Sequence, residues 1–180
     1  YFQSAIEATM VVGDAFAEPI AGAADKVAAA LRAGNSIFSC GEKAGSLVAQ
    51  LFTDYLALGF EIERPGFPAL NINKLAADDI ASERYAQALH THGSSADILL
   101  VVSAGQSSQS IVSLIKAAVD KDMSVVLLSA ENDALLASHL GYNDVQINLG
   151  QFSGEIVTQA QFQVIQCICT LVDHQLFGGY

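Results

Sequence analysis

The chain has 180 residues, of which 52% are hydrophobic and only 15% are charged. Nineteen acidic and eight basic residues give a net charge of −11, which argues against direct binding of nucleic acid because phosphates would be repelled. No stretch approaches the ~18 consecutive apolar residues that a membrane span needs. The excess of apolar residues therefore favours subunit interfaces, and we expect a cytoplasmic homo-oligomer that neither binds nor crosses a membrane.

The chain begins with two predicted helices. Residues 1–4, Tyr-Phe-Gln-Ser, resemble the end of a tobacco etch virus protease site, so we set them aside as an expression-tag remnant. The remaining residues, 5–180, are predicted to form a single domain. Alanine-rich helices are expected at 5–17 and 20–33, with Pro19 as a first-turn residue of the second. We assign this helical segment, residues 5–34, to oligomerisation.

Strands and helices then alternate along the rest of the chain. Short apolar runs predict buried strands, and apolar residues three and four apart predict helices. In chain order the pattern predicts strand 36–40, helix 46–58, strand 67–72, helix 78–89, strand 98–102, a helix from 111, strand 124–129, helix 133–139, strand 145–149 and helix 153–176. Five such alternations indicate an α/β fold with a parallel sheet covered on both faces. Ligands of such sheets bind at the carboxyl ends of the strands.

The turn after the strand 98–102 carries the main candidate site. Ser103, Ser107 and Ser108 stand between that strand and the following helix, where free N–H groups and the helix dipole favour an anion. Either Ser107 or Ser108 is also a good N-cap, so simple capping is the alternative interpretation. We call residues 103–108 the serine loop.

The cysteines and histidines do not indicate a metal site. Cys40, Cys167 and Cys169 are interpreted as small core residues in a reducing compartment. His90 and His92 are interpreted as a solvated helix C-terminus, which cationic and polar groups suit. We therefore expect no metal and no cofactor.

Four segments resemble the sugar isomerase (SIS) domain family, in the branch of the phosphoheptose isomerases and the DnaA initiator-associating proteins. Residues 39–46, Ser-Cys-Gly-Glu-Lys-Ala-Gly-Ser, stand where the family has Cys-Gly-Asn-Gly-Gly-Ser, and residues 63–70 match its Arg-Pro-Gly-Tyr-Pro-Ala-Ile segment. The serine loop stands where the family has Ser-Thr-Ser-Gly-Asn-Ser, and the tail 167–177 resembles that of the initiator-associating proteins. The resemblance implies a three-layer αβα, flavodoxin-like fold with a five-stranded parallel sheet and added N-terminal helices.

The resemblance also implies a phosphate loop that uses Ser103, Ser107, Ser108 and Ser46. Residual binding of a sugar phosphate and a capped helix in an emptied pocket remain equal alternatives. Lys43 could add positive charge to such a site, although a solvated surface lysine is the commoner case.

The departures from the family pattern remove the expected catalytic groups. The isomerases use a Glu and a His as acid and base, and the aligned positions here are Tyr55 and Gln161. An amide cannot replace imidazole as a base. A histidine that helps bind zinc in some members is replaced by Leu51. No catalytic residue is therefore assigned, with Asp54 and Asp79 kept as alternative bases.

The resemblance favours a homotetramer, built by the first two helices and the last helix, that binds a replication initiator protein through Leu176 and Phe177. Multivalent presentation would add weak contacts together. The alternative for Leu176 and Phe177 is packing onto the chain's own core. Two further functions stay open, namely a divergent sedoheptulose 7-phosphate isomerase and a regulator that senses a phosphosugar.

Overall fold

The computed structural model describes residues 1–76, 82–105 and 108–178, and its centre is a parallel sheet of five strands. The strand order β2-β1-β3-β4-β5 is the flavodoxin-like order and confirms the expected fold class. The strands are β1 (Ile37–Gly41), β2 (Ala69–Asn71), β3 (Ile98–Val102), β4 (Ser124–Ser129) and β5 (Val145–Asn148).

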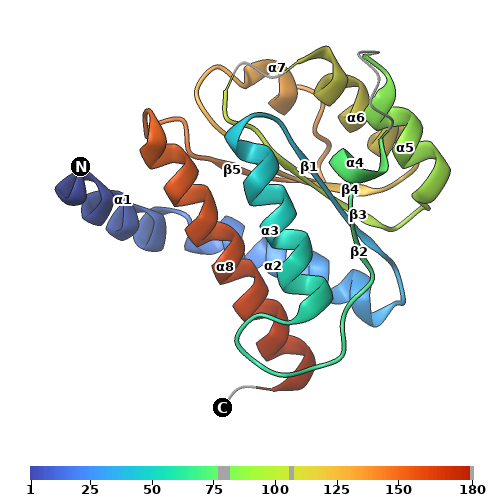
Figure 1. Cartoon of the computed structure of the whole chain (residues 1–180), viewed down its shortest axis with the longest axis horizontal. Coiled ribbons are helices and arrows are strands. Elements are labelled where there is room, and N and C mark those ends of the chain that lie inside the picture. The colour runs from blue at the N-terminus through green and yellow to red at the C-terminus, as the bar shows by residue number, and fades with distance from the viewer. Residues whose placement is uncertain (77–81, 106–107, 179–180) are drawn as a thin grey trace.

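Helices cover both faces of this sheet (Figure 1). They are α1 (Phe2–Ala15), α2 (Ala17–Arg32), α3 (Ala44–Leu58), α4 (Ile72–Leu75), α5 (Arg84–His92), α6 (Gln109–Asp120), α7 (Ala134–Ala137) and α8 (Glu155–Phe177). Helices α2, α3 and α8 pack on one face, whereas α5 and α6 pack on the other. Because both faces are covered, the central strands are apolar on both sides, as the continuous run of β3 predicted.

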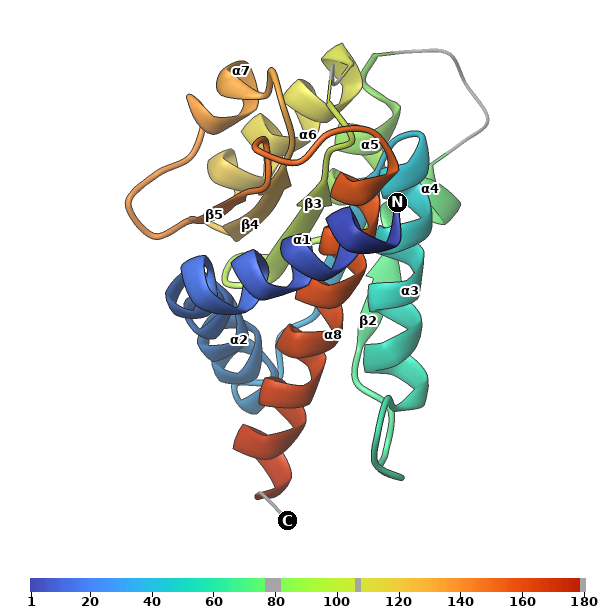
Figure 2. The same ribbon diagram turned by 90° about the vertical axis from the view of Figure 1, so that its left-hand side faces the viewer.

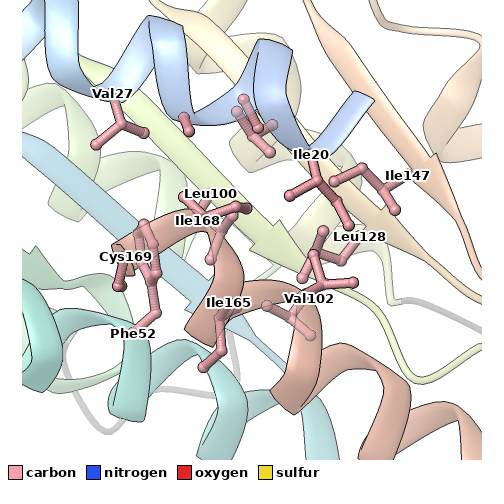
Figure 3. Packing of buried hydrophobic residues seen from close by; sticks show 14 of the residues in the cluster. Ile20, Val27, Phe52, Leu100, Val102, Leu128, Ile147, Ile165, Ile168 and Cys169 are labelled. Atoms are coloured by element: carbon pink, nitrogen blue, oxygen red, sulfur yellow. The ribbon is translucent and has the colours of Figure 1, made fainter. Parts of the chain in front are cut away.

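Alternate residues of each strand enter two separate hydrophobic clusters. Leu100 and Val102 of β3 point toward α2 and α8, where they meet Ile20, Ile165 and their neighbours (Figure 3). Leu99 and Val101 point to the opposite face, toward α5 and α6. This division fixes the register of β3 and so places the start of the serine loop at the upper edge of the sheet, as drawn in Figure 1.

The N-terminal helices begin earlier than the sequence predicted. Helix α1 starts at Phe2, so the residues set aside as a tag remnant continue into the helix, and α2 starts at Ala17 with Pro19 in third position. Pro19 is tolerated there because first-turn N–H groups have no partner within the helix. Helix α1 crosses the first half of α8 (Figure 2), where Gln163 Nε2 donates to Thr9 Oγ1 at 2.7 Å.

Two other expectations are corrected. Helix α4, which the sequence analysis did not predict, follows β2 directly, and it is capped by the Asn71 side chain, which accepts from Lys74 N at 3.3 Å. Helix α5 spans Arg84–His92, whereas a helix was predicted at 78–89. Residues 77–81 lie outside the described part of the chain.

Cys167 is exposed on α8, whereas Cys40 and Cys169 are buried as expected. None of the described helices is long and apolar enough to cross a membrane.

Candidate functional site

The carboxyl ends of β1 and β3 lie side by side and bring two loops together. Gly41, the last residue of β1, is paired in register with Val102, the last residue of β3. A Cβ atom on Gly41 would lie 2.4 Å from Gly45 O, and one on Gly45 would lie 2.5 Å from Val102 O. Only glycine fits such close backbone approaches, so the loop after β1 is packed directly against the end of β3.

This packing brings the side chain of Glu42 to the start of α6. Ser108, the N-cap residue of α6, donates its backbone N–H to Glu42 Oε2 at 3.1 Å and its hydroxyl to Glu42 Oε1 at 2.5 Å. The helix dipole stabilises a carboxylate in this position. The N-terminus of α6 is thus capped by a residue 66 positions earlier in the chain.

The other predicted ligand serines have different neighbours. The Ser103 hydroxyl is buried and accepts from Gly105 N at 3.1 Å. The Ser46 hydroxyl donates to Lys43 O at 2.7 Å, within the first turn of α3, and Lys43 itself is exposed. Ser107 lies outside the described residues. Their role in binding phosphate stays a prediction.

Gln161, at the expected position of the family's histidine, is fully buried against the serine loop. Its Nε2 donates to Ser103 O at 2.6 Å. Its Oε1 has no hydrogen-bond partner among the described residues. The amide therefore links α8 to Ser103, the first residue of the serine loop, but it supplies no titratable group.

Tyr55, at the expected position of the family's glutamate, lies further along the α3–α8 pair. Its hydroxyl is 3.4 Å from Gln166 Nε2, and its ring packs on Phe60 with centroids 4.2 Å apart. Gln166 follows Gln161 by five residues, which is about 7.5 Å along a helix. The alternative base Asp54 accepts from Gln50 Nε2 at 2.7 Å, and Asp79 is outside the described residues.

A polar network holds the other side of the β1 end. Gly41 exchanges two hydrogen bonds with the Asn73 side chain, whose Nδ2 also contacts the Tyr85 hydroxyl, which accepts from Arg84 at 2.8 Å. Burial, with the nearby Glu42 carboxylate, raises the pKa of the Cys40 thiol. Burial also raises the pKa of Tyr85. Cys40 is therefore protonated, and it is not an activated nucleophile.

No group of three or more His, Cys, Asp or Glu side chains in the described ranges is placed to hold a metal ion. Leu51 is half-buried and packs against the core. His90 and His92 lie exposed in the last turn of α5, which confirms the interpretation of a solvated helix end.

A second polar centre lies at the opposite end of α3 and α8. Arg64 Nε donates to Asp173 Oδ1 at 2.6 Å, and both side chains are buried. The same guanidinium donates to the carbonyls of Tyr55 and Leu56 at 2.9 Å each, which satisfies the last carbonyls of α3. Its carbon also lies 4.1 Å from the centre of the Phe67 ring.

The two predicted partner-binding residues lie beside this ion pair. Phe177 is 49% exposed and stacks on Phe67 with ring centroids 6.0 Å apart. Leu176 is half-buried and packs against the core. Both side chains thus contact the chain itself, Leu176 more fully than Phe177, and their role in binding a partner stays a prediction. We call Arg64, Phe67, Asp173 and Phe177 the Arg64 cluster.

Sequence reasoning did not assign roles to Glu42, Phe67 or Asp173. Glu42 could have been noticed because a carboxylate stands where the family loop has an asparagine. Phe67 belongs to the matched segment 63–70, and Asp173 belongs to the matched tail. Arg64 and its partner Asp173 are 109 residues apart in the sequence, and no local pattern indicates such a pair.

A parallel sheet in this strand order, with a polar loop after its central strand, defines an open, doubly wound α/β protein with a candidate ligand site at the carboxyl ends of its strands. A family model described as "SIS domain" matches residues 1–130. The chain therefore belongs to the SIS domain family.

The relatives fall into two functional groups. The DnaA initiator-associating proteins DiaA of Klebsiella pneumoniae and Enterobacter sp. are 31% and 32% identical to this chain, each over 98% of it and 93% of the relative. A solved phosphoheptose isomerase from Francisella tularensis is 26% identical, with a TM-score of 0.84, covering 97% of this chain and 95% of that one. Over nearly its whole length, the chain is thus similar both to proteins named as DnaA initiator-associating and to a phosphoheptose isomerase.

Proposed function

We propose that this chain is a non-catalytic SIS-domain protein that regulates the initiation of replication by binding an initiator of the DnaA type. The observation that carries the proposal is the half-exposed Phe177, stacked on Phe67, in a chain whose relatives are named as initiator-associating. An exposed aromatic ring beside an arginine is typical of the residues that dominate protein interfaces.

The state of the former catalytic positions supports this proposal. Isomerisation moves a proton between two carbons and needs groups with suitable pKa values close to the substrate. Gln161 offers an amide that is bonded to Ser103 O, and Tyr55 is bonded to Gln166 further from the loop. The side chains at these two positions are therefore used in packing rather than in proton transfer.

We also propose that the chain assembles into a homotetramer through α1, α2 and α8, which would present several copies of Phe177 at once. An apolar groove of about 470 Å³ runs between these helices, and Cys167 lies in its wall. Ile6 and Met10 on α1 are 62% and 63% exposed. Burial of this face against a second copy would remove apolar surface from water.

The assembly is tested by comparing the sedimentation velocity of Met10→Glu with that of the parent chain. A tetramer unaffected by the added charge would contradict this interface.

The binding proposal is tested with purified DnaA and immobilised chain. Phe177→Ala should abolish or strongly weaken binding while the stability changes by under about 1 kcal/mol, because the ring is half-exposed. Tyr142→Ala is the matched control, since Tyr142 is 97% exposed on a different surface. Equal binding by Phe177→Ala and the parent chain would exclude this surface, and no binding by the parent chain would refute the proposed partner.

A second candidate function is isomerisation of a phosphorylated sugar, favoured by the likeness to the Francisella tularensis phosphoheptose isomerase. The test is turnover of sedoheptulose 7-phosphate by the purified chain. Turnover that is lost in Ser108→Ala or Asp54→Ala would establish this function in place of the first. We expect no turnover, because neither Tyr55 nor Gln161 supplies a carboxylate or an imidazole.

A further inference from the structure

Glu42 places a carboxylate of the chain itself at the anion position of the serine loop. Each of its two oxygens accepts one hydrogen bond from Ser108, one from the backbone N–H and one from the hydroxyl. An anion held by a backbone N–H and a hydroxyl at the start of a helix is the arrangement in which proteins bind phosphate. We propose that Glu42 is a built-in substitute for a phosphate group, and that it occupies the anion position at Ser108 and thereby excludes phosphate esters from it.

The backbone around Glu42 is organised to hold it there. On one side, Gly41 is fixed by two hydrogen bonds to the Asn73 side chain. On the other side, the backbone of Lys43 has φ 51° and ψ −130°, a conformation that residues other than glycine rarely adopt. Surrounding contacts must maintain such a backbone, so the reach of Glu42 to Ser108 is set by the fold of its loop.

A second observation concerns Gln161, the buried residue that contacts Ser103. Gln161 is fully buried, and one end of its amide is bonded to Ser103 O. The other end, Oε1, lacks a donor among the described residues. Buried polar atoms are normally satisfied, and a ligand hydroxyl is one group that could satisfy this oxygen. Gln161 of α8 thus provides, beside Ser103, a buried acceptor for which the described residues supply no donor, while Glu42 occupies the anion position at Ser108.

Charge makes the exclusion selective against phosphate esters in particular. A phosphate group and the Glu42 carboxylate would compete for the same N–H and hydroxyl of Ser108, and at close range they repel each other. Lys43, the cation of the same loop, is exposed, where solvent screens its charge. Entry of a phosphate ester thus requires displacement of Glu42.

The proposal is tested by titrating inorganic phosphate, and then sedoheptulose 7-phosphate, into the parent chain and Glu42→Ala. Binding is read from the NMR shift of the Ser108 amide, with sodium chloride at matched ionic strength, since any salt screens a net charge of −11. We expect Glu42→Ala to bind phosphate at least roughly tenfold more tightly than the parent chain. Glu63→Gln removes the same single negative charge at an exposed residue between α3 and β2, away from Glu42 and Ser108, and it should bind phosphate as the parent chain does.

Two further variants make the result decisive. Glu42→Gln keeps the shape of the side chain without its charge and carries the test if Glu42→Ala fails to fold. Adding Ser108→Ala to either variant should remove the gain in phosphate binding. Equal phosphate affinity in the parent chain and the Glu42 variants, or no binding by folded Glu42 variants, would overturn the proposal. The test uses no protein partner, so its outcome is independent of the proposed binding of an initiator.

Discussion

The two ends of the α3–α8 pair differ in what they leave available to other molecules. At the serine loop, Glu42 and Gln161 use their side chains to satisfy Ser108 and Ser103. At the Arg64 cluster, a buried ion pair supports an aromatic ring that is half-exposed. Both views show the two ends far apart, at the top and bottom of the molecule (Figures 1 and 2).

This difference bears on the kind of molecule that each end can bind. A site for a small molecule needs polar groups that stay unpaired until the ligand binds, whereas a protein-binding surface needs exposed apolar groups on a rigid support. At the serine loop, Ser108 is paired with Glu42 and Ser103 O with Gln161, whereas at the Arg64 cluster the Phe177 ring is left half-exposed. The same two helices support both ends.

The largest expected effect breaks the Arg64 cluster. Asp173→Ala leaves the buried Arg64 guanidinium without its carboxylate, and we expect a loss of about 3–5 kcal/mol in the free energy of unfolding. The measurement is urea denaturation followed by circular dichroism. Arg32→Ala is the control, because exposed Arg32 donates to Gln175 O at the surface, and its loss should cost under about 1 kcal/mol. A similar small loss for Asp173→Ala would mean that the ion pair does not hold this end together.

A smaller effect is expected at the serine loop. Gln161→Ala removes the 2.6 Å bond to Ser103 O and leaves a cavity, but it also removes the buried Oε1 that lacks a partner. We expect a net loss of about 2 kcal/mol in the same urea experiment. Gln163→Ala removes an amide that donates to Thr9 at the surface and should cost less. If Gln161→Ala is as stable as the parent chain, the link between α8 and Ser103 does not stabilise the fold.

The smallest effect per group concerns the two buried thiols, one at each end. Burial raises the pKa of Cys40, beside Glu42, and of Cys169, beside Asp173, above the ordinary value of 9.0. Above pH 9 the unfolded chain therefore loses thiol protons that the folded chain keeps. Stability is complete below about pH 9 and falls above it, by up to about 1.4 kcal/mol per pH unit for each thiol.

Urea denaturation between pH 8 and pH 10.5 measures this slope. Cys40→Ala and Cys169→Ala should each reduce the slope by the share of one thiol, whereas Cys167→Ala, at an exposed position, should change it less. An unchanged slope in Cys40→Ala would show that water reaches this thiol and that the serine-loop end is more open than the Arg64 cluster.

Much of this architecture could be predicted from local patterns. The continuous run Ile98–Val102 indicated a strand buried on both sides, and the serines that follow it indicated the start of a helix. The aligned motifs also predicted that Tyr55 and Gln161 stand at the positions of the family's acid and base, and this remains a prediction. Helix α4 was missed because it is a single turn whose cap, Asn71, looks like part of a strand. Cys167 was misplaced because helix periodicity does not show which side of α8 lies against α1 and α2.

The sequence by itself determined the order of the five strands, the main helices between them and the class of fold, because these depend on residue types and short spacings. Tertiary structure alone decided that Glu42 caps α6 across 66 residues and that Arg64 meets Asp173 across 109. Such contacts depend on which strands are neighbours and on their register, and a one-residue shift would turn these side chains to the other face. The serine loop is a recognisable motif in the sequence, but its occupation by the chain's own carboxylate appears only in the folded molecule.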